Sequence, residues 1–144
     1  MSSERLWSPA FINYGVSSGI FYMTQYVLVA ALPIILTAEL GGTALDAGLA
    51  MTYFQIGTIL CRPFAGRLID GLDKRIILLI SSVLFFIIMG LFNLTTSLQT
   101  IFVLRGIHGA IFALGTTVMA ALAVVVLPAS RKGEGINMFA VFSI

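Results

Sequence analysis

Charged residues are scarce in this sequence: Asp, Glu, Lys and Arg make up 10% of its 144 residues, against about 25% in an ordinary soluble domain. So few charges cannot cover the surface of a soluble protein of this size. Intrinsic disorder is also excluded, because 59% of the residues are hydrophobic and disordered chains lack that apolar content. With a mean hydropathy of +1.06, the composition predicts a membrane protein.

Cysteine and histidine each occur once, as Cys61 and His108. A single cysteine excludes a disulfide scaffold. One Cys and one His cannot supply a metal-ligand set, so we expect no metal site. No other pattern in the sequence indicates a cofactor, and we expect none. Intramembrane hydrolases need a Ser–His arrangement or paired aspartates, and no acid lies deep inside an apolar stretch here. We therefore expect no enzymatic activity.

The charges occur in clusters that are separated by long uncharged runs. These runs of 33, 29 and 25 residues lie between Arg5 and Glu39, Arg75 and Arg105, and Arg105 and Arg131. A transmembrane helix needs about 20 apolar residues. Turn signals divide the chain into four full spans, roughly 9–36, 44–66, 76–93 and 98–127, and a cut-off fifth at 136–144. The sequence therefore predicts an all-α membrane protein.

The basic residues are distributed unevenly among the connections between these spans. Seven lie at the N-terminus, around the connection after the second span, or after the fourth: Arg5, Arg62, Arg67, Lys74, Arg75, Arg131 and Lys132. The connections at 39–43 and 94–97 have none. Because cytoplasmic loops carry the excess of Lys and Arg, we expect a multi-pass protein of the cell (plasma or inner) membrane with a cytoplasmic N-terminus. The net charge of +2 then reflects topology and does not indicate a nucleic-acid partner.

The two connections without basic residues contain helix-start sequences. Thr43-Ala-Leu-Asp46 and Thr96-Ser-Leu-Gln99 each fit a capping box, in which two side chains at a helix start bond reciprocally to backbone N–H groups. We therefore interpret Asp46 as a helix-capping acid, ahead of the alternative that it is a substrate or proton site.

Arg105 is the only charged residue well inside a span, seven residues past the start of the fourth and thus roughly 10 Å deep. A charge at that depth costs at least about 2.5 kcal/mol. We expect Arg105 to face a water-filled cavity or a partner acid; the alternative is a structural bond to backbone carbonyls. At 100° per residue, one face of this span carries Arg105, His108, Gly109, Phe112, Thr116 and Met119.

His108 lies one helical turn from Arg105. Its ordinary pKa would allow it to titrate at working pH, but a neutral histidine that bonds between helices is the interpretation we favour.

The first span has a polar face. Its members, which fall within about 140° of arc, are Asn13, Tyr14, Ser17, Ser18, Thr24 and Gln25. Gly15 and Gly19 lie outside this arc, and small residues at that spacing let another helix approach closely. We expect the polar face to line a cavity, and hydrogen bonding between helices is the alternative.

The connection between the second and third spans reads Gly66-Arg-Leu-Ile-Asp70-Gly-Leu-Asp73-Lys74-Arg75. This short charged segment resembles the signature of the major facilitator superfamily, roughly G-x-L-x-D-R-x-G-R/K-R/K. The matching positions are Gly66, Leu68, Asp70, Lys74 and Arg75. Gly71 stands where a basic residue is usual, and Asp73 stands where Gly is usual.

Two further segments are similar to that family. The pattern l-x-x-x-R-x-x-q-G of its fourth helix is matched by Ile101, Arg105, His108 and Gly109, with His in place of Gln. The segment Pro128-x-x-Arg131-x-Gly133-x-Gly135 resembles the family's fourth-to-fifth connection. The resemblance covers essentially the whole chain, as four helices and the start of a fifth from the N-terminal domain of a twelve-helix bundle.

The resemblance implies a secondary active transporter of small organic molecules, of the drug or metabolite exporter type. Its simplest form is proton-coupled efflux by alternating access, with a small-molecule substrate, protons and the lipid bilayer as partners. In such a protein Asp70 would help to latch the inner gate, Arg105 would take part in proton coupling, and the first and fourth helices would line the central cavity.

We expect the chain to behave as an N-terminal fragment whose other partners are the missing C-terminal helices of the same chain. The alternative is a complete four-helix membrane protein that acts as a small dimeric transporter or as a membrane assembly factor.

Overall fold

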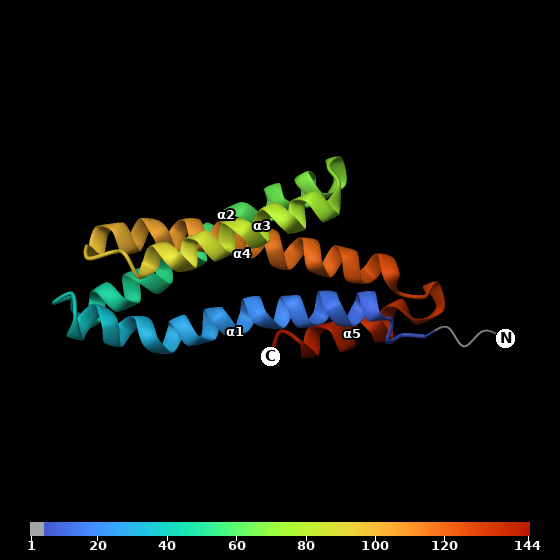
Figure 1. Cartoon of the computed structure of the whole chain (residues 1–144), viewed down its shortest axis with the longest axis horizontal. Coiled ribbons are helices and arrows are strands. Elements are labelled where there is room, and N and C mark those ends of the chain that lie inside the picture. The colour runs from blue at the N-terminus through green and yellow to red at the C-terminus, as the bar shows by residue number, and fades with distance from the viewer. Residues whose placement is uncertain (1–4) are drawn as a thin grey trace.

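The computed structural model describes residues 5–144, which form five α-helices and one short 3-10 helix (Figure 1). The elements are α1 (Pro9–Ala38), α2 (Ala44–Gly71), α3 (Lys74–Phe92), α4 (Leu98–Val126), η1 (Ala129–Arg131) and α5 (Lys132–Val141). Within residues 5–144 there is no strand. The first four α-helices are long and apolar enough to cross a membrane, so the predicted all-α membrane fold is confirmed.

Two helix boundaries differ from those expected. α2 continues to Gly71, so residues 66–70 of the charged segment lie in its last turns and not in a loop. The turn comes only at Leu72 and Asp73, both of which have extended backbones. The Asp73 carboxylate then caps α3 by accepting from the Arg75 backbone N–H at 2.7 Å. The fifth helix begins at Lys132, four residues before the predicted stretch, and ends at Val141.

The start of α2 confirms one of the two predicted capping boxes. The Thr43 backbone N–H donates to the Asp46 carboxylate at 2.7 Å, and the Asp46 backbone N–H donates to the Thr43 hydroxyl at 3.3 Å. The capping box predicted at Thr96–Gln99 is wrong. α4 begins one residue later than that motif requires, so Ser97 is the N-cap and makes no side-chain capping bond.

α4 is the central helix of the bundle and packs against α1, α2, α3 and α5. Of the most apolar 18-residue segment of α4, 50% is buried inside the bundle, against 22% of the corresponding segment in each of the other three long helices. In Figure 1, the second half of α4 runs between α3 and α1. Every member of the predicted inward face is buried: Arg105, His108, Gly109, Phe112, Thr116 and Met119.

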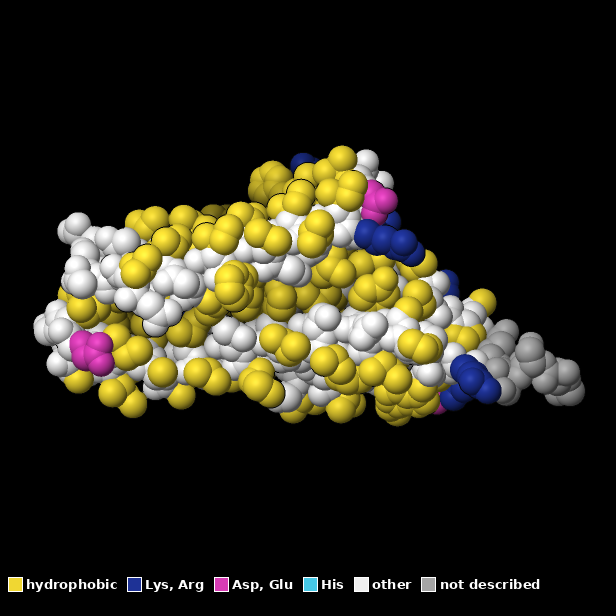
Figure 2. Space-filling model, in the orientation of Figure 1, with side chains coloured by type: hydrophobic (Ala, Val, Ile, Leu, Met, Phe, Trp, Pro, Cys, Tyr) yellow, Lys and Arg dark blue, Asp and Glu magenta, His cyan; other side chains and the backbone are white. Residues whose placement is uncertain are grey.

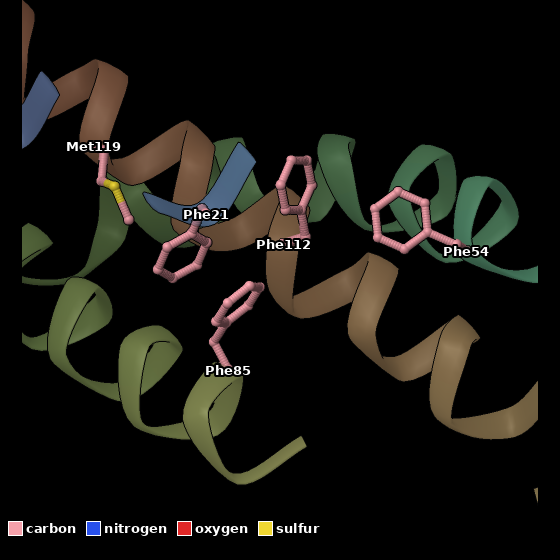
Figure 3. Packing of buried hydrophobic residues seen from close by; sticks show 5 residues of the cluster. All are labelled: Phe21, Phe54, Phe85, Phe112 and Met119. Carbon is pink, nitrogen blue, oxygen red and sulfur yellow. The ribbon is translucent and has the colours of Figure 1, made fainter. Parts of the chain in front are cut away.

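An aromatic cluster joins the four long helices at mid-length. It contains Phe21 of α1, Phe54 of α2, Phe85 of α3, and Phe112 and Met119 of α4 (Figure 3). The Phe21 and Phe85 rings stack with centroids 4.0 Å apart. Because each helix contributes at least one large side chain, burial of this cluster fixes the relative positions of all four.

The predicted close approach at the two glycines of α1 is confirmed. A Cβ atom on Gly15 would lie 2.6 Å from the ring of Phe142, and one on Gly19 would lie 3.1 Å from the Phe142 carbonyl oxygen. The segment that approaches here is the end of α5, which runs beside α1 (Figure 1).

Apart from the buried Arg105, the described basic side chains gather toward one end of the molecule (Figure 2). The start of α1, the turn between α2 and α3, and the connection from α4 to α5 all lie at this end (Figure 1). Figure 2 shows the Lys and Arg side chains of the visible face there, while the length of the bundle is covered mainly by hydrophobic side chains. The basic residues that are clustered along the sequence are therefore also close together in the folded structure.

Candidate functional site

Arg105 lies inside the bundle, and its side chain is 0% exposed. Its Nε donates to the Ala50 carbonyl oxygen of α2 at 3.3 Å, and its Nη1 donates to the Gln25 Oε1 of α1 at 3.2 Å. Nη1 also donates to His108 Nδ1 at 3.2 Å, and Nη2 donates to Met51 Sδ at 3.2 Å. The guanidinium group therefore joins α1, α2 and α4.

The face of the Phe54 ring lies beneath this guanidinium group, with the Arg105 Cζ 4.6 Å from the ring centroid. Such a position gives a cation–π attraction that is stronger where water is excluded. We call the six residues in these contacts the Arg105 cluster: Gln25, Ala50, Met51, Phe54, Arg105 and His108.

All the acceptors in the Arg105 cluster are uncharged. Within residues 5–144, Arg105 forms no ion pair; the ion pair of this part of the chain joins Arg131 and Glu134 at 2.8 Å. In the described part of the chain, no acid forms an ion pair with Arg105, and its side chain is fully buried. Instead, the cation is held by a backbone carbonyl, which was the alternative interpretation, and by side chains of three helices. The cluster therefore carries an uncompensated positive charge.

His108 is also 0% exposed. Arginine has no acceptor atom, so the His108 Nδ1 must accept the bond from Arg105. The histidine is then neutral, and its proton is on Nε2. That atom has no hydrogen-bond partner, and the rings of Phe54, Phe85 and Phe92 surround His108 with centroids at 5.1, 5.2 and 5.9 Å.

Gly109 brings the backbones of α2 and α4 together. A Cβ atom there would overlap the Phe54 carbonyl oxygen, and a Cβ atom on Gly57 would overlap the Gly106 carbonyl oxygen. The Thr58 hydroxyl donates to the Gly109 carbonyl oxygen at 3.2 Å across the same contact. Gly109 thus acts in helix packing, which positions Ala50 and Phe54 against Arg105.

Thr116, which lies on the same face of α4 as Arg105, is buried. Its hydroxyl donates to the Phe112 carbonyl oxygen of its own helix at 2.8 Å. The Thr116 hydroxyl therefore has its hydrogen-bond partner within α4 itself.

The polar face of α1 is divided between the interior and the surface. Gln25 is buried in the Arg105 cluster, and Ser18 is buried with an unpartnered hydroxyl. Asn13 is exposed, Ser17 is half-buried, and Thr24 lines a cavity. The structure therefore brings Gln25 to Arg105 and leaves Asn13 and Ser17 away from the cluster.

A cavity of about 540 Å³ lies between α1 and the adjoining ends of α3 and α4, and Figure 2 shows the hollow between α1 and α3. Its lining is mainly apolar, and the polar lining residues are Thr24, Glu39, Asn93 and Thr95. Phe92 lines the cavity and also packs on the His108 ring. The Phe92 ring therefore lies between the cavity and His108.

The charged segment between α2 and α3 lies at the basic end of the molecule. Leu68 and Asp70 are exposed in the last turns of α2, and Gly66 has open space where a side chain would be. Lys74 and Arg75 begin α3. Among the described residues, Asp70 has no hydrogen bond or ion pair, so its carboxylate is available to a further partner.

The contribution of α2 to the Arg105 cluster was not predicted from the sequence. Ala50 offers only a backbone carbonyl, which leaves no signal in the residue type. A signal was present in the spacing, since Ala50, Phe54 and Thr58 recur every four residues and share one helix face. That face is the one that meets α4.

Comparison with known proteins identifies the family. Residues 14–144 match the family model described as Major Facilitator Superfamily. The chain is also 42% identical over 54 residues to uncharacterized MFS-type transporters from three strains of Pseudomonas aeruginosa. That alignment covers 38% of this chain and 13% of each of these relatives. Because the family match extends over most of its residues, the chain belongs to the Major Facilitator Superfamily.

Proposed function

We propose that this chain forms the N-terminal part of a secondary active transporter that exports small organic molecules in exchange for protons. The observation that carries the proposal is the Arg105 cluster. A fully buried cation is costly at membrane depth and is typical of substrate or ion pathways. Here it connects α1, α2 and α4 through neutral acceptors, so its bonds can be exchanged when helices move.

In this proposal the two polar regions have different roles. Arg105, with Gln25 and His108, responds to the substrate or to protons inside the membrane. Asp70 acts at the basic end, where its exposed carboxylate pairs with groups of the other half of the transporter and holds the inner gate closed. Breaking that contact lets the two halves rock about the central cavity.

We also propose that the basic end faces the cytoplasm in the inner or plasma membrane. The positive-inside rule supports this orientation, because the exposed Lys and Arg side chains gather at the end that contains the start of α1 and the α2–α3 turn.

The roles of Arg105 and Asp70 are tested with the protein expressed from its native gene and reconstituted in liposomes. Two impermeant dyes, cationic ethidium and anionic carboxyfluorescein, serve as transport probes. We expect Arg105→Ala and Asp70→Ala each to reduce the rate at least about tenfold, since each removes an interaction used in the transport cycle. Asp73→Ser is the matched control, because it removes a charge from the same segment while serine can still cap α3. Wild-type rates in both alanine variants would show that these roles are wrong.

Proton coupling is tested in the same liposomes by imposing a pH gradient. Dye movement should follow the size of the pH gradient and stop when a protonophore is added. A rate that ignores the pH gradient and follows a sodium gradient would contradict the proposal.

A further inference from the structure

We propose that the His108 Nε2–H binds a carboxylate or similar anionic group of the transported molecule. Arg105 fixes the tautomer that presents this donor and supplies the compensating positive charge. This inference rests on the proposed function and deepens it, because it names the class of substrate: organic anions with an apolar body.

The first step of the argument concerns the free donor. The bond from Arg105 occupies Nδ1 at 3.2 Å, so the His108 proton is held on Nε2, on the opposite side of the ring. This N–H is buried and has no partner. Buried polar groups are nearly always hydrogen-bonded, and an exception in a folded protein calls for an explanation. A bound acceptor in part of the transport cycle supplies one.

The second step concerns charge. Arg105 has no carboxylate partner within residues 5–144. Glu39, the residue that follows α1, is fourteen residues beyond Gln25, about 21 Å along the helix axis, which is too far to compensate for the Arg105 charge. Asp46 lies one helical turn from Ala50, but its carboxylate is bonded to the Thr43 backbone N–H and hydroxyl at the start of α2. An anion on Nε2 would be linked to the guanidinium through the imidazole ring. Donation into Nδ1 polarises the ring, and this strengthens the hydrogen bond that Nε2–H gives. A cation in the same place would be repelled.

The third step concerns access. Phe54, Phe85 and Phe92 surround the His108 ring, and of these only Phe92 also lines the 540 Å³ cavity. Phe92 is half-buried, whereas the other two are buried. Rotation of the Phe92 side chain would open the cavity toward the His108 ring. The mainly apolar cavity lining then suits an apolar body attached to the anionic group.

The test follows the two ring nitrogens of His108 by NMR. The protein expressed from its native gene carries isotope-labelled histidine and is placed in lipid nanodiscs, and the His108 signals are assigned as those that disappear in His108→Gln. We expect a protonated Nε2 and an unprotonated Nδ1. Benzoate should shift the Nε2 signal, while benzylamine, which has the same ring and the opposite charge, should leave it unchanged. A proton on Nδ1, no response to benzoate, or an equal response to both probes would overturn the proposal.

Variants supply a second measurement, the binding of radiolabelled benzoate. His108→Gln keeps an acceptor for Arg105 and a donor for the anion, so affinity should stay within about threefold. His108→Phe removes the donor and should weaken binding at least about tenfold. Unchanged binding in His108→Phe would overturn the proposal; if that variant does not fold, the NMR result for the unaltered chain decides.

The two proposals can fail separately. Export of ethidium without any benzoate response would leave the transporter standing and remove the anion site. A benzoate response without transport of either dye would support the anion site at His108 and contradict the proposed transport.

Discussion

Gln25 and Asn13 both belong to the polar face of α1, yet their surroundings differ. Gln25 accepts a hydrogen bond from the buried Arg105 guanidinium, whereas Asn13 is exposed. At the scale of single residues, a polar side chain of α1 therefore contributes to the bundle only where it bonds to another buried polar group. The residue type alone does not show whether such a hydrogen-bond partner lies nearby.

Gln25→Ala is expected to lower the free energy of unfolding by about 1–3 kcal/mol, because it removes an acceptor from a buried guanidinium N–H. Asn13→Ala, on the same helix, is the control and should change it by less than about 0.5 kcal/mol. Thermal or denaturant unfolding in detergent measures both. Equal effects would show that the Gln25–Arg105 bond does not contribute to stability.

Glu134 should titrate below its ordinary pKa of 4.5, because the Arg131 side chain donates hydrogen bonds to both of its carboxylate oxygens at 2.8 Å. A lowered folded-state pKa means that the contribution to stability is present above pH 4.5 and is lost as the pH falls through the lowered value. Carboxyl NMR titration measures the pKa. Arg131→Gln should move it back toward 4.5, and an unchanged pKa in that variant would contradict the assignment.

At the scale of helices, α2 and α4 form the closest pair. Gly57 and Gly109 allow their backbones to touch, and the Thr58 hydroxyl bonds across the contact. This approach places the Ala50 carbonyl and the Phe54 ring against Arg105. Packing of small residues is a main source of helix association in membranes, so the buried charge depends on glycines that have no polar group of their own.

Gly57→Ala is expected to destabilise the bundle by about 1–3 kcal/mol, because the new methyl group would meet the α4 backbone and force the helices apart. Gly48→Ala is the matched control on α2, since its Cβ would have open space, and it should be neutral or slightly stabilising. The measurement is unfolding in detergent. The prediction fails if the two variants are equally stable.

Thr43→Ala is expected to cost about 1 kcal/mol, because it removes half of the reciprocal cap at the start of α2. Ser97→Ala at the start of α4 should cost less, since the Ser97 side chain makes no capping bond. The same unfolding assay compares the two. A larger loss for Ser97→Ala would contradict the capping geometry.

At the scale of the whole molecule, the distribution of charge is the main asymmetry. Apart from the buried Arg105, the described basic residues lie toward one end of the bundle, and the connections at residues 39–43 and 94–97 lie at the other. Between the two ends the surface is mainly hydrophobic (Figure 2). This arrangement suits a lipid bilayer around the middle of the bundle and assigns a different side of the membrane to each end.

Cysteine labelling of intact cells tests the proposed orientation. In a Cys61→Ser background, Thr96→Cys should react with a membrane-impermeant thiol reagent, whereas Leu72→Cys should react only after the cells are opened. Both positions are exposed in the structure, so the difference reports the side of the membrane. The reverse pattern would place the basic end outside.

Much of the fold could be predicted because a membrane helix is defined by local composition. Long uncharged runs together with turn signals marked the four apolar helices, and the 100° periodicity of α4 marked its buried face. The prediction was wrong at Thr96, because a shift of one residue in the helix start removes the capping geometry. It also failed at residues 66–70, where a charged segment that reads as a loop continues a helix.

The sequence by itself determined the membrane class, the apolar helices, the uneven placement of basic residues and the presence of one intramembrane arginine. Only the tertiary structure decided what that arginine contacts. Its partners include a backbone carbonyl of α2, an aromatic face and the nitrogen of a neighbouring histidine. The physical reason is that an apolar helix is defined by residues that are neighbours in the sequence, whereas the contacts of a buried charge depend on which helices pack against it. That packing depends in turn on where glycines allow two backbones to meet.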